Sequence, residues 1–122
     1  MAMFSEAPRD FTATDIPAPE IIDPNSVPSY RWGFIGAGDI AEVMAAALAK
    51  HTNQRVVAVG SQTPGKGKAF ADRFGIERHY DNYADLANDP EVDIVYVATL
   101  PHTHLADARH AIRAGKHVLI EK

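Results

Sequence analysis

Residues 31–122 alternate between two patterns of apolar and polar positions. Short runs rich in valine and isoleucine are typical of β-strands, and stretches with apolar residues three and four apart are typical of amphipathic helices. The predicted strands cover residues 31–36, 55–60, 79–80, 92–98 and 117–120. The fourth run is apolar over almost its whole length, as expected of a strand that is covered on both faces.

Apolar residues at helical spacing predict which face of each helix is buried. The expected inward residues of the first helix are Ile40, Val43, Met44, Ala47 and Leu48. A second helix is expected from Thr63-Pro64, as cap and first turn, to Gly75, with Ala69, Phe70 and Phe74 inward. A brief helix should lie between Asn82 and Pro90. The last helix should run from Pro101 to Gly115, with Leu105, Ala108 and Ile112 inward.

The order of these elements, with a helix after each of the first four strands, predicts the α/β class. Right-handed crossovers then give a parallel sheet of the Rossmann type, doubly wound and in three layers. The expected strand order is 3-2-1-4-5. A ligand is expected where this order reverses, at the carboxyl ends of the first and fourth strands.

Residues 1–30 differ in composition from the rest and predict an arm that precedes a 31–122 domain. This segment holds five of the eight prolines and five acids, a composition that does not support a regular helix or a central strand. It is either a loose tail or an extended segment that docks on its own or a neighbouring subunit. Its possible anchors are Phe4, Phe11, Ile16, Ile21 and Ile22.

The composition excludes several classes of function. A net charge of −4 over 122 residues gives no basic surface for nucleic acid or an anionic membrane. The absence of cysteine excludes disulfides, thiolate metal sites and a cysteine nucleophile, and it fits a cytoplasmic location. No apolar run has the length of a membrane span, and no basic start precedes an apolar stretch as in a secretory signal.

The turn from the first strand to the first helix reads Gly36-Ala37-Gly38-Asp39-Ile40-Ala41. The spacing G-x-G-x-x-A is a form of the dinucleotide-binding fingerprint. Gly36 permits a sharp turn, Gly38 lets a pyrophosphate approach the main chain, and the helix start adds free N–H groups. We therefore predict that residues 36–40 bind a nucleotide cofactor. The alternative is a glycine-rich packing turn that binds nothing.

The end of the second strand indicates which cofactor is bound. NAD sites place an acid here to hold the ribose, as methyltransferase sites do, whereas NADP sites place small polar or basic groups. The chain has Ser61, Gln62 and Thr63, with Lys66 close behind and no acid. This favours NADP over NAD, although Gln62 is not the arginine that would decide the choice. The alternative is a solvated loop.

Two further segments reach the same edge of the sheet. Thr99, Leu100, Pro101 and His104 follow the fourth strand and are expected to line the cofactor site. His102 and His104 lack an acidic third ligand nearby, so we predict no metal site. The last strand places Glu121 and Lys122 at this edge, where a lysine could transfer the proton that accompanies hydride transfer. The alternative for Lys122 is an ordinary surface residue.

Residues 31–122 resemble the glucose-fructose oxidoreductase, inositol dehydrogenase and rhizopine-catabolism (Gfo/Idh/MocA) family. The similar segments are the 36–41 turn, Ala58-Val59-Gly60-Ser61, the 92–99 run and the closing Ala114-Gly115-Lys116-His117-Val118-Leu119-Ile120-Glu121-Lys122. The closing segment is the most specific. Where many members have asparagine and arginine, this chain has His102 and Gln62.

The resemblance implies an oxidoreductase that uses NADP or NAD on a sugar, cyclitol or related polyol. It implies that Lys122 is catalytic, that Glu121 contacts the cofactor, and that the full-length enzyme is a homo-oligomer. Members continue with a second α/β domain that covers the nicotinamide, and by this resemblance we expect that domain to be missing from residues 1–122. We therefore expect the chain to bind cofactor without turnover; the alternative is a stand-alone, non-enzymatic module that binds or senses the cofactor.

Overall fold

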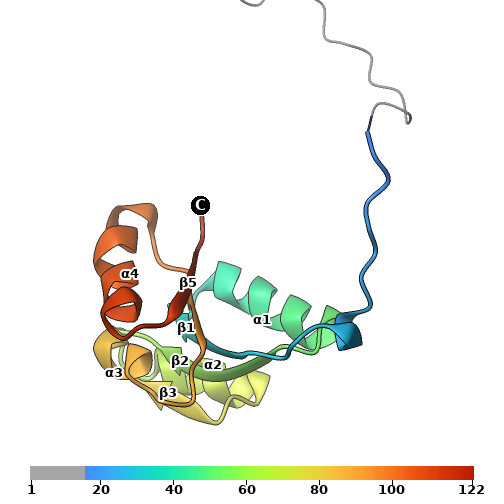
Figure 1. Ribbon diagram of the computed structural model, residues 1–122. Coiled ribbons are helices and arrows are strands. Elements are labelled where there is room, and N and C mark those ends of the chain that lie inside the picture. The colour runs from blue at the N-terminus through green and yellow to red at the C-terminus, as the bar shows by residue number, and fades with distance from the viewer. Residues whose placement is uncertain (1–15) are drawn as a thin grey trace, which may run out of the picture.

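The computed structural model describes residues 16–122, which form a five-stranded sheet with helices on both faces (Figure 1). The strands are β1 (Arg31–Ile35), β2 (Arg55–Gly60), β3 (Arg78–Tyr80), β4 (Ile94–Val97) and β5 (His117–Ile120). All neighbouring strands are parallel, and their order is β3-β2-β1-β4-β5. The predicted α/β class, Rossmann-type sheet and strand order are confirmed.

Four helices complete the three layers: α1 (Asp39–His51), α2 (Lys66–Phe74), α3 (Tyr83–Ala87) and α4 (His104–Arg113). Successive residues of a strand point to opposite faces of the sheet. Phe34 therefore packs in the core beneath α1 and α2, and Ile35 packs in the core beneath α3 and α4. Figure 1 shows α1 and α4 on opposite sides of the sheet. Among residues 16–122, no helix has the length and apolar character of a membrane span.

The predicted buried face of α1 is wrong at three of five positions. Ile40, Val43 and Ala47 are exposed, Val43 by 63%, whereas Leu48 is buried and Met44 packs at the edge of the core. The residues that face the sheet are instead Ala41 and Ala45. Small side chains let the helix axis approach the strands closely, so the helix turns its alanines inward and leaves larger apolar residues outside.

The same preference for small residues where a helix meets the sheet explains why the predicted buried faces of α4 and α2 are also partly wrong. In α4, Leu105 and Ile112 are 69% and 63% exposed, while Ala108 and Ala111 are buried. In α2, Phe70 and Phe74 lie in or against the core as predicted, but Ala69 is exposed. The buried positions beside the two phenylalanines of α2 are Gly67 and Ala71.

The ends of the helices agree with the sequence except at the start of α2. Asn82 caps α3 by accepting a hydrogen bond from the Asp85 amide at 2.8 Å, and glycines end α2 and α4 as predicted. Thr63 is not the cap of α2, because that helix begins at Lys66 with Gly65 in a left-handed conformation before it. Thr63 instead lies in a turn in which its carbonyl accepts from the Lys66 amide. The last helix opens with a 3-10 turn, Pro101–Thr103, ahead of α4.

The segment before β1 is fastened to the turn between α1 and β2. Gln54 donates from Nε2 to the Pro28 carbonyl at 2.8 Å, and Asn53 donates from Nδ2 to the Val27 carbonyl at 2.8 Å. Residues 16–23 lead away from the sheet, and Ile16, Ile21 and Ile22 are exposed (Figure 1). The other two predicted anchors, Phe4 and Phe11, lie outside the described residues.

The turn after β1 holds three strand ends together. Gly36 has φ of +102°, a left-handed conformation that favours glycine. Its amide donates to the Gly60 carbonyl at 2.9 Å, and the Ala98 amide donates to the Ile35 carbonyl at 2.8 Å. A Cβ on Gly36 would stand 3.1 Å from both the carbonyl carbon and the oxygen of Ala98. The space at this turn therefore admits only glycine without a shift of β4.

We expect Gly36→Ala to lower the free energy of unfolding by about 1–3 kcal/mol, because alanine is strained at positive φ and its Cβ meets backbone. Urea denaturation measures this loss. Gly38→Ala is the matched control: a Cβ there meets nothing within 4 Å, so its effect should stay within about 1 kcal/mol. Equal losses in the two variants would contradict the structural reason.

Candidate functional site

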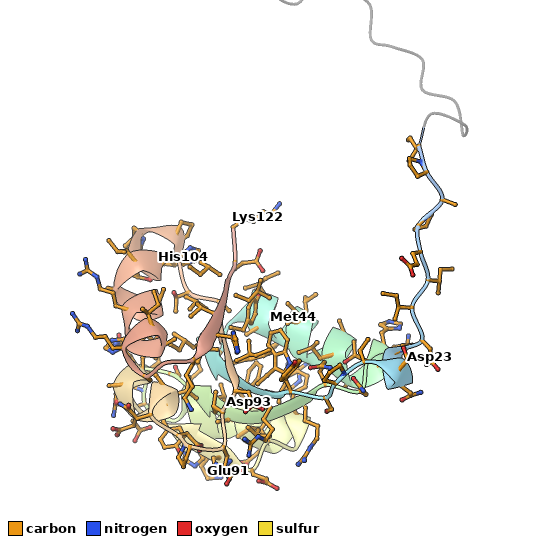
Figure 2. All side chains as sticks on the ribbon, in the orientation of Figure 1. Asp23, Met44, Glu91, Asp93, His104 and Lys122 are labelled. Carbon is orange, nitrogen blue, oxygen red and sulfur yellow. The ribbon has the colours of Figure 1, made fainter. Side chains whose placement is uncertain are left out.

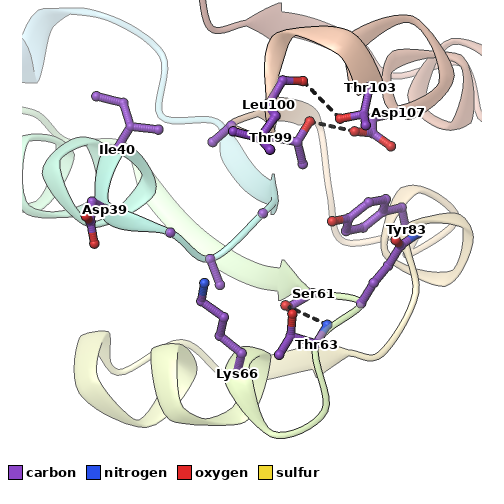
Figure 3. Close-up of a pocket in the computed structure, with 15 residues that line it drawn as sticks. Asp39, Ile40, Ser61, Thr63, Lys66, Tyr83, Thr99, Leu100, Thr103 and Asp107 are labelled. Atoms are coloured by element: carbon purple, nitrogen blue, oxygen red, sulfur yellow. Dashed lines mark hydrogen bonds between the residues drawn. The ribbon is translucent and has the colours of Figure 1, made fainter.

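A cavity opens at the carboxyl ends of β1, β2 and β4, where the strand order reverses. Its volume is about 520 Å³. Ten residues predicted for the cofactor site line it: Gly36, Ala37, Gly38, Asp39, Ile40, Ser61, Gln62, Lys66, Thr99 and Leu100. The lining also includes Thr63, Tyr83, Ala98, Thr103 and Asp107 (Figure 3). The structure thus brings three separate turns of the chain together around one space.

The start of α1 forms one side of this cavity. Gly38 is the N-cap residue, and a Cβ built on it would meet nothing within 4 Å, so the main chain is open to the cavity here. The first amides of a helix have no acceptor within the helix and carry the positive end of its dipole. Asp39 is exposed in the first turn, where an acid favours the helix itself. This side of the cavity can bind an anion through backbone N–H groups.

The loop after β2 forms the floor. Ser61 is buried; its amide donates to the Tyr80 carbonyl at 3.1 Å, and its Oγ accepts from the Thr63 amide at 3.2 Å. Gln62 and Lys66 are exposed, and Figure 3 shows the Lys66 amine directed into the cavity. Within residues 16–122, Lys66 forms no ion pair, so its charge is available to a ligand.

The wall opposite Lys66 contains polar residues that sequence reasoning missed. Asp107 is only 6% exposed, and its Oδ2 accepts a hydrogen bond from Thr99 Oγ1 at 2.5 Å. Burial raises the pKa of Tyr83, the negative charge of Asp107 raises it further, and a backbone hydrogen bond at Gln62 opposes both effects. The sequence signal for this wall is the i, i+4 spacing of Thr103 and Asp107, which puts both on one side of a helix.

Four predicted site residues do not line the cavity: Pro101, His104, Glu121 and Lys122. Pro101 is exposed. His104 holds the loop after β4, because its Nε2 lies 2.8 Å from the Thr99 carbonyl oxygen. A carbonyl only accepts hydrogen bonds, so Nε2 carries the hydrogen. Figure 2 shows His104 and Lys122 at the same edge of the molecule, beyond the end of β5. Among residues 16–122, no group of three potential metal ligands is present.

Glu121 is held by a buried tyrosine. The Tyr96 hydroxyl donates to Glu121 Oε2, and the Lys122 amide donates to Oε1 at 3.1 Å. The tyrosine hydrogen bond, and after it the amide hydrogen bond, lower the pKa of Glu121. Burial, and then the bond to Glu121, raise the pKa of Tyr96. Glu121 is therefore a fixed carboxylate, whereas the Lys122 side chain beside it is exposed.

Comparison with known proteins gives relatives for most of the chain. 1,5-Anhydro-D-fructose reductase of Ensifer adhaerens is 41% identical over 92 residues, which are 75% of this chain and 28% of that protein. Myo-inositol dehydrogenase of Lactobacillus casei, solved with NAD(H) and myo-inositol, aligns with a TM-score of 0.72 and 26% identity over 78% of this chain and 29% of that one. Biliverdin reductase of a Synechocystis species, solved with biliverdin and NADP⁺, aligns with a TM-score of 0.68 and 34% identity over 76% of this chain and 29% of that one.

The family described as oxidoreductases with an NAD-binding Rossmann fold matches residues 30–122. This range contains the whole sheet and the cavity at its carboxyl edge. The chain spans less than a third of the length of the relatives named above. The resemblance inferred from the sequence is confirmed: this chain belongs to the Gfo/Idh/MocA oxidoreductase family and carries its NAD-binding Rossmann fold.

Proposed function

We propose that residues 31–122 are the cofactor-binding domain of an oxidoreductase that acts on a sugar, cyclitol or related polyol by hydride transfer. The observation that carries this proposal is the open main chain of Gly38 at the start of α1, inside the cavity. The sugar and polyol enzymes among the relatives support the substrate class. Those relatives are named as reductases and dehydrogenases, which favours an enzyme over a stand-alone sensing module.

The lining fits a nicotinamide dinucleotide. The backbone at Gly36, Gly38 and Asp39 would hold the pyrophosphate, and Ser61 with Lys66 would hold the adenosine ribose or its phosphate. Leu100 gives an exposed apolar contact beside Thr99 on the wall opposite Lys66. A bound nicotinamide ring supplies or accepts a hydride. Residues 27–30 form hydrogen bonds to the α1–β2 turn, so the contacts of the proposed domain extend a few residues ahead of position 31.

Lys122 is the residue that we propose for proton transfer at the substrate hydroxyl or carbonyl. The Glu121 carboxylate positions the backbone of Lys122, because the Tyr96 hydroxyl holds that carboxylate and the Lys122 amide donates to it. An ammonium group beside a fixed carboxylate can give its proton to a substrate oxygen and take it back. Glu121 would lie next to the cofactor in this arrangement.

We further propose that NADP is preferred to NAD. Lys66 and Ser61 present a cation and a hydroxyl at the end of β2, where NAD-specific sites carry an acid. The relatives include complexes with NAD(H) and with NADP⁺, so the family accommodates both. The preference therefore rests on the residues of this loop.

Gly38→Val should abolish the binding of NADPH and NADH, because the new side chain would occupy the space of the pyrophosphate. Calorimetry on the purified 122-residue chain measures the affinity. The control is urea denaturation of the same variant. The variant should remain folded, because a Cβ at this position meets no protein atom within 4 Å. Binding of cofactor by a folded Gly38→Val chain as tightly as by the original would refute the proposed phosphate site.

Lys66→Ala should weaken NADPH binding by about tenfold and change NADH binding by less than about threefold, because the strongest contact of the cation would be with the 2′-phosphate, which NADH lacks. The matched control is Lys68→Ala. Lys68 lies on the same helix but pairs with Asp72 at 2.7 Å and does not line the cavity. Tighter binding of NADH than NADPH, with both affinities unchanged in Lys66→Ala, would overturn the preference.

These 122 residues alone should bind cofactor but oxidise no sugar, cyclitol or polyol. Hydride transfer needs a substrate that is held close to the cofactor and aligned with it. Lys122 is exposed and stands outside the cavity, so the described residues do not enclose a substrate beside it. A panel of polyols, followed by nicotinamide absorbance, tests this. Oxidation of any of these substrates by the purified chain would contradict the proposal that it binds the cofactor without catalysing hydride transfer.

A further inference from the structure

Asp107 has surroundings that the proposed pyrophosphate and ribose contacts do not explain. It is an acid that is more than nine-tenths buried, it lines the cavity, and it forms no ion pair within residues 16–122. A buried carboxylate without a cation is costly unless hydrogen bonds satisfy it. The Thr99 hydroxyl provides one hydrogen bond, at 2.5 Å to Oδ2. Carboxylate oxygens together accept about four, so Asp107 retains capacity for a ligand.

The neighbours of Asp107 place it at the adenosine end of the cavity. Asp107, Tyr83 and Gln62 line the same cavity, and Figure 3 shows Tyr83 between Asp107 and the loop after β2 that holds Ser61 and Thr63. Gln62 belongs to the loop after β2, and that loop receives the adenosine ribose in folds of this type. A base joined to that ribose would lie beside Tyr83 and Asp107, which line the same cavity as this loop.

We propose that Asp107 selects the base of the cofactor by accepting a hydrogen bond from the 6-amino group of adenine. This inference rests on the proposed cofactor-binding function. A carboxylate has no hydrogen to donate, so it favours an amino group at position 6 and repels a carbonyl oxygen there. Thr99 fixes the carboxylate in place, and Asp107 is thus a specificity-determining residue of the adenosine subsite.

The experiment compares NAD⁺ with its 6-oxo analogue, nicotinamide hypoxanthine dinucleotide, by calorimetry on the 122-residue chain. The unaltered protein should bind the adenine form at least about tenfold more tightly, the range expected of a hydrogen bond to a charged group. In Asp107→Asn the ratio should fall to within about threefold, because an amide can turn either its oxygen or its NH₂ toward the base. Glu77→Gln is the control, since Glu77 is exposed, pairs with Arg78 at 3.4 Å, does not line the cavity and should leave the ratio unchanged.

A purely structural role for Asp107, or a contact with ribose alone, would make Asp107→Asn weaken both dinucleotides equally, and an unchanged ratio would overturn the proposal. Equal binding of the two dinucleotides by the unaltered chain would overturn it as well, even if no Asp107 variant folds. That result would leave the proposed cofactor function intact. Failure of the unaltered chain to bind either dinucleotide would instead refute the cofactor function, and the inference with it.

Discussion

The left-handed turn at Gly36 is the constraint on which the rest of the site depends. It lets the chain leave β1 within van der Waals contact of the Ala98 backbone while its amide binds the Gly60 carbonyl. The ends of β1, β2 and β4 are thereby fixed relative to one another. Each of these ends leads into a loop that lines the cavity. A Cβ at position 36 would stand 3.1 Å from the Ala98 backbone, so a side chain there would shift the end of β4 at the edge of the cavity.

Close approach also decides how the helices are turned. Ala41, Ala45, Ala108 and Ala111 face the sheet, and bulkier residues such as Val43 and Leu105 remain at the surface. Sequence periodicity finds a stripe of large apolar residues, but the distance between helix and sheet depends on the smallest residues of the contact. The strands, their order and most caps were predictable because local patterns determine them. The rotation of each helix about its axis was not, because it is a property of the packed layers.

The residues of the candidate site likewise divide into those that the sequence predicts and those that only the structure reveals. The residues of the 36–40 turn and the loop after β2 are local in sequence, and their spacing was enough to predict that they line one cavity. The wall formed by Tyr83, Thr103 and Asp107 comes from α3, from the 3-10 turn Pro101–Thr103 and from α4, and only the fold brings α3 beside the other two. Asp107 was missed because a lone acid in a first helical turn resembles an ordinary helix-stabilising residue. Its burial and its bond to Thr99 appear only in three dimensions.

The charges around the cavity are arranged unequally, and this arrangement restricts what can fill it. The start of α1 and the Lys66 amine offer positive potential at one side, whereas the Asp107 carboxylate offers acceptors at the opposite wall. A simple anion would satisfy the first side and be repelled by the second. A simple cation would be repelled by the first side and attracted by the second. A ligand that is anionic at its centre and carries a hydrogen-bond donor at one end satisfies both, and a dinucleotide with an adenine base has that distribution of charge.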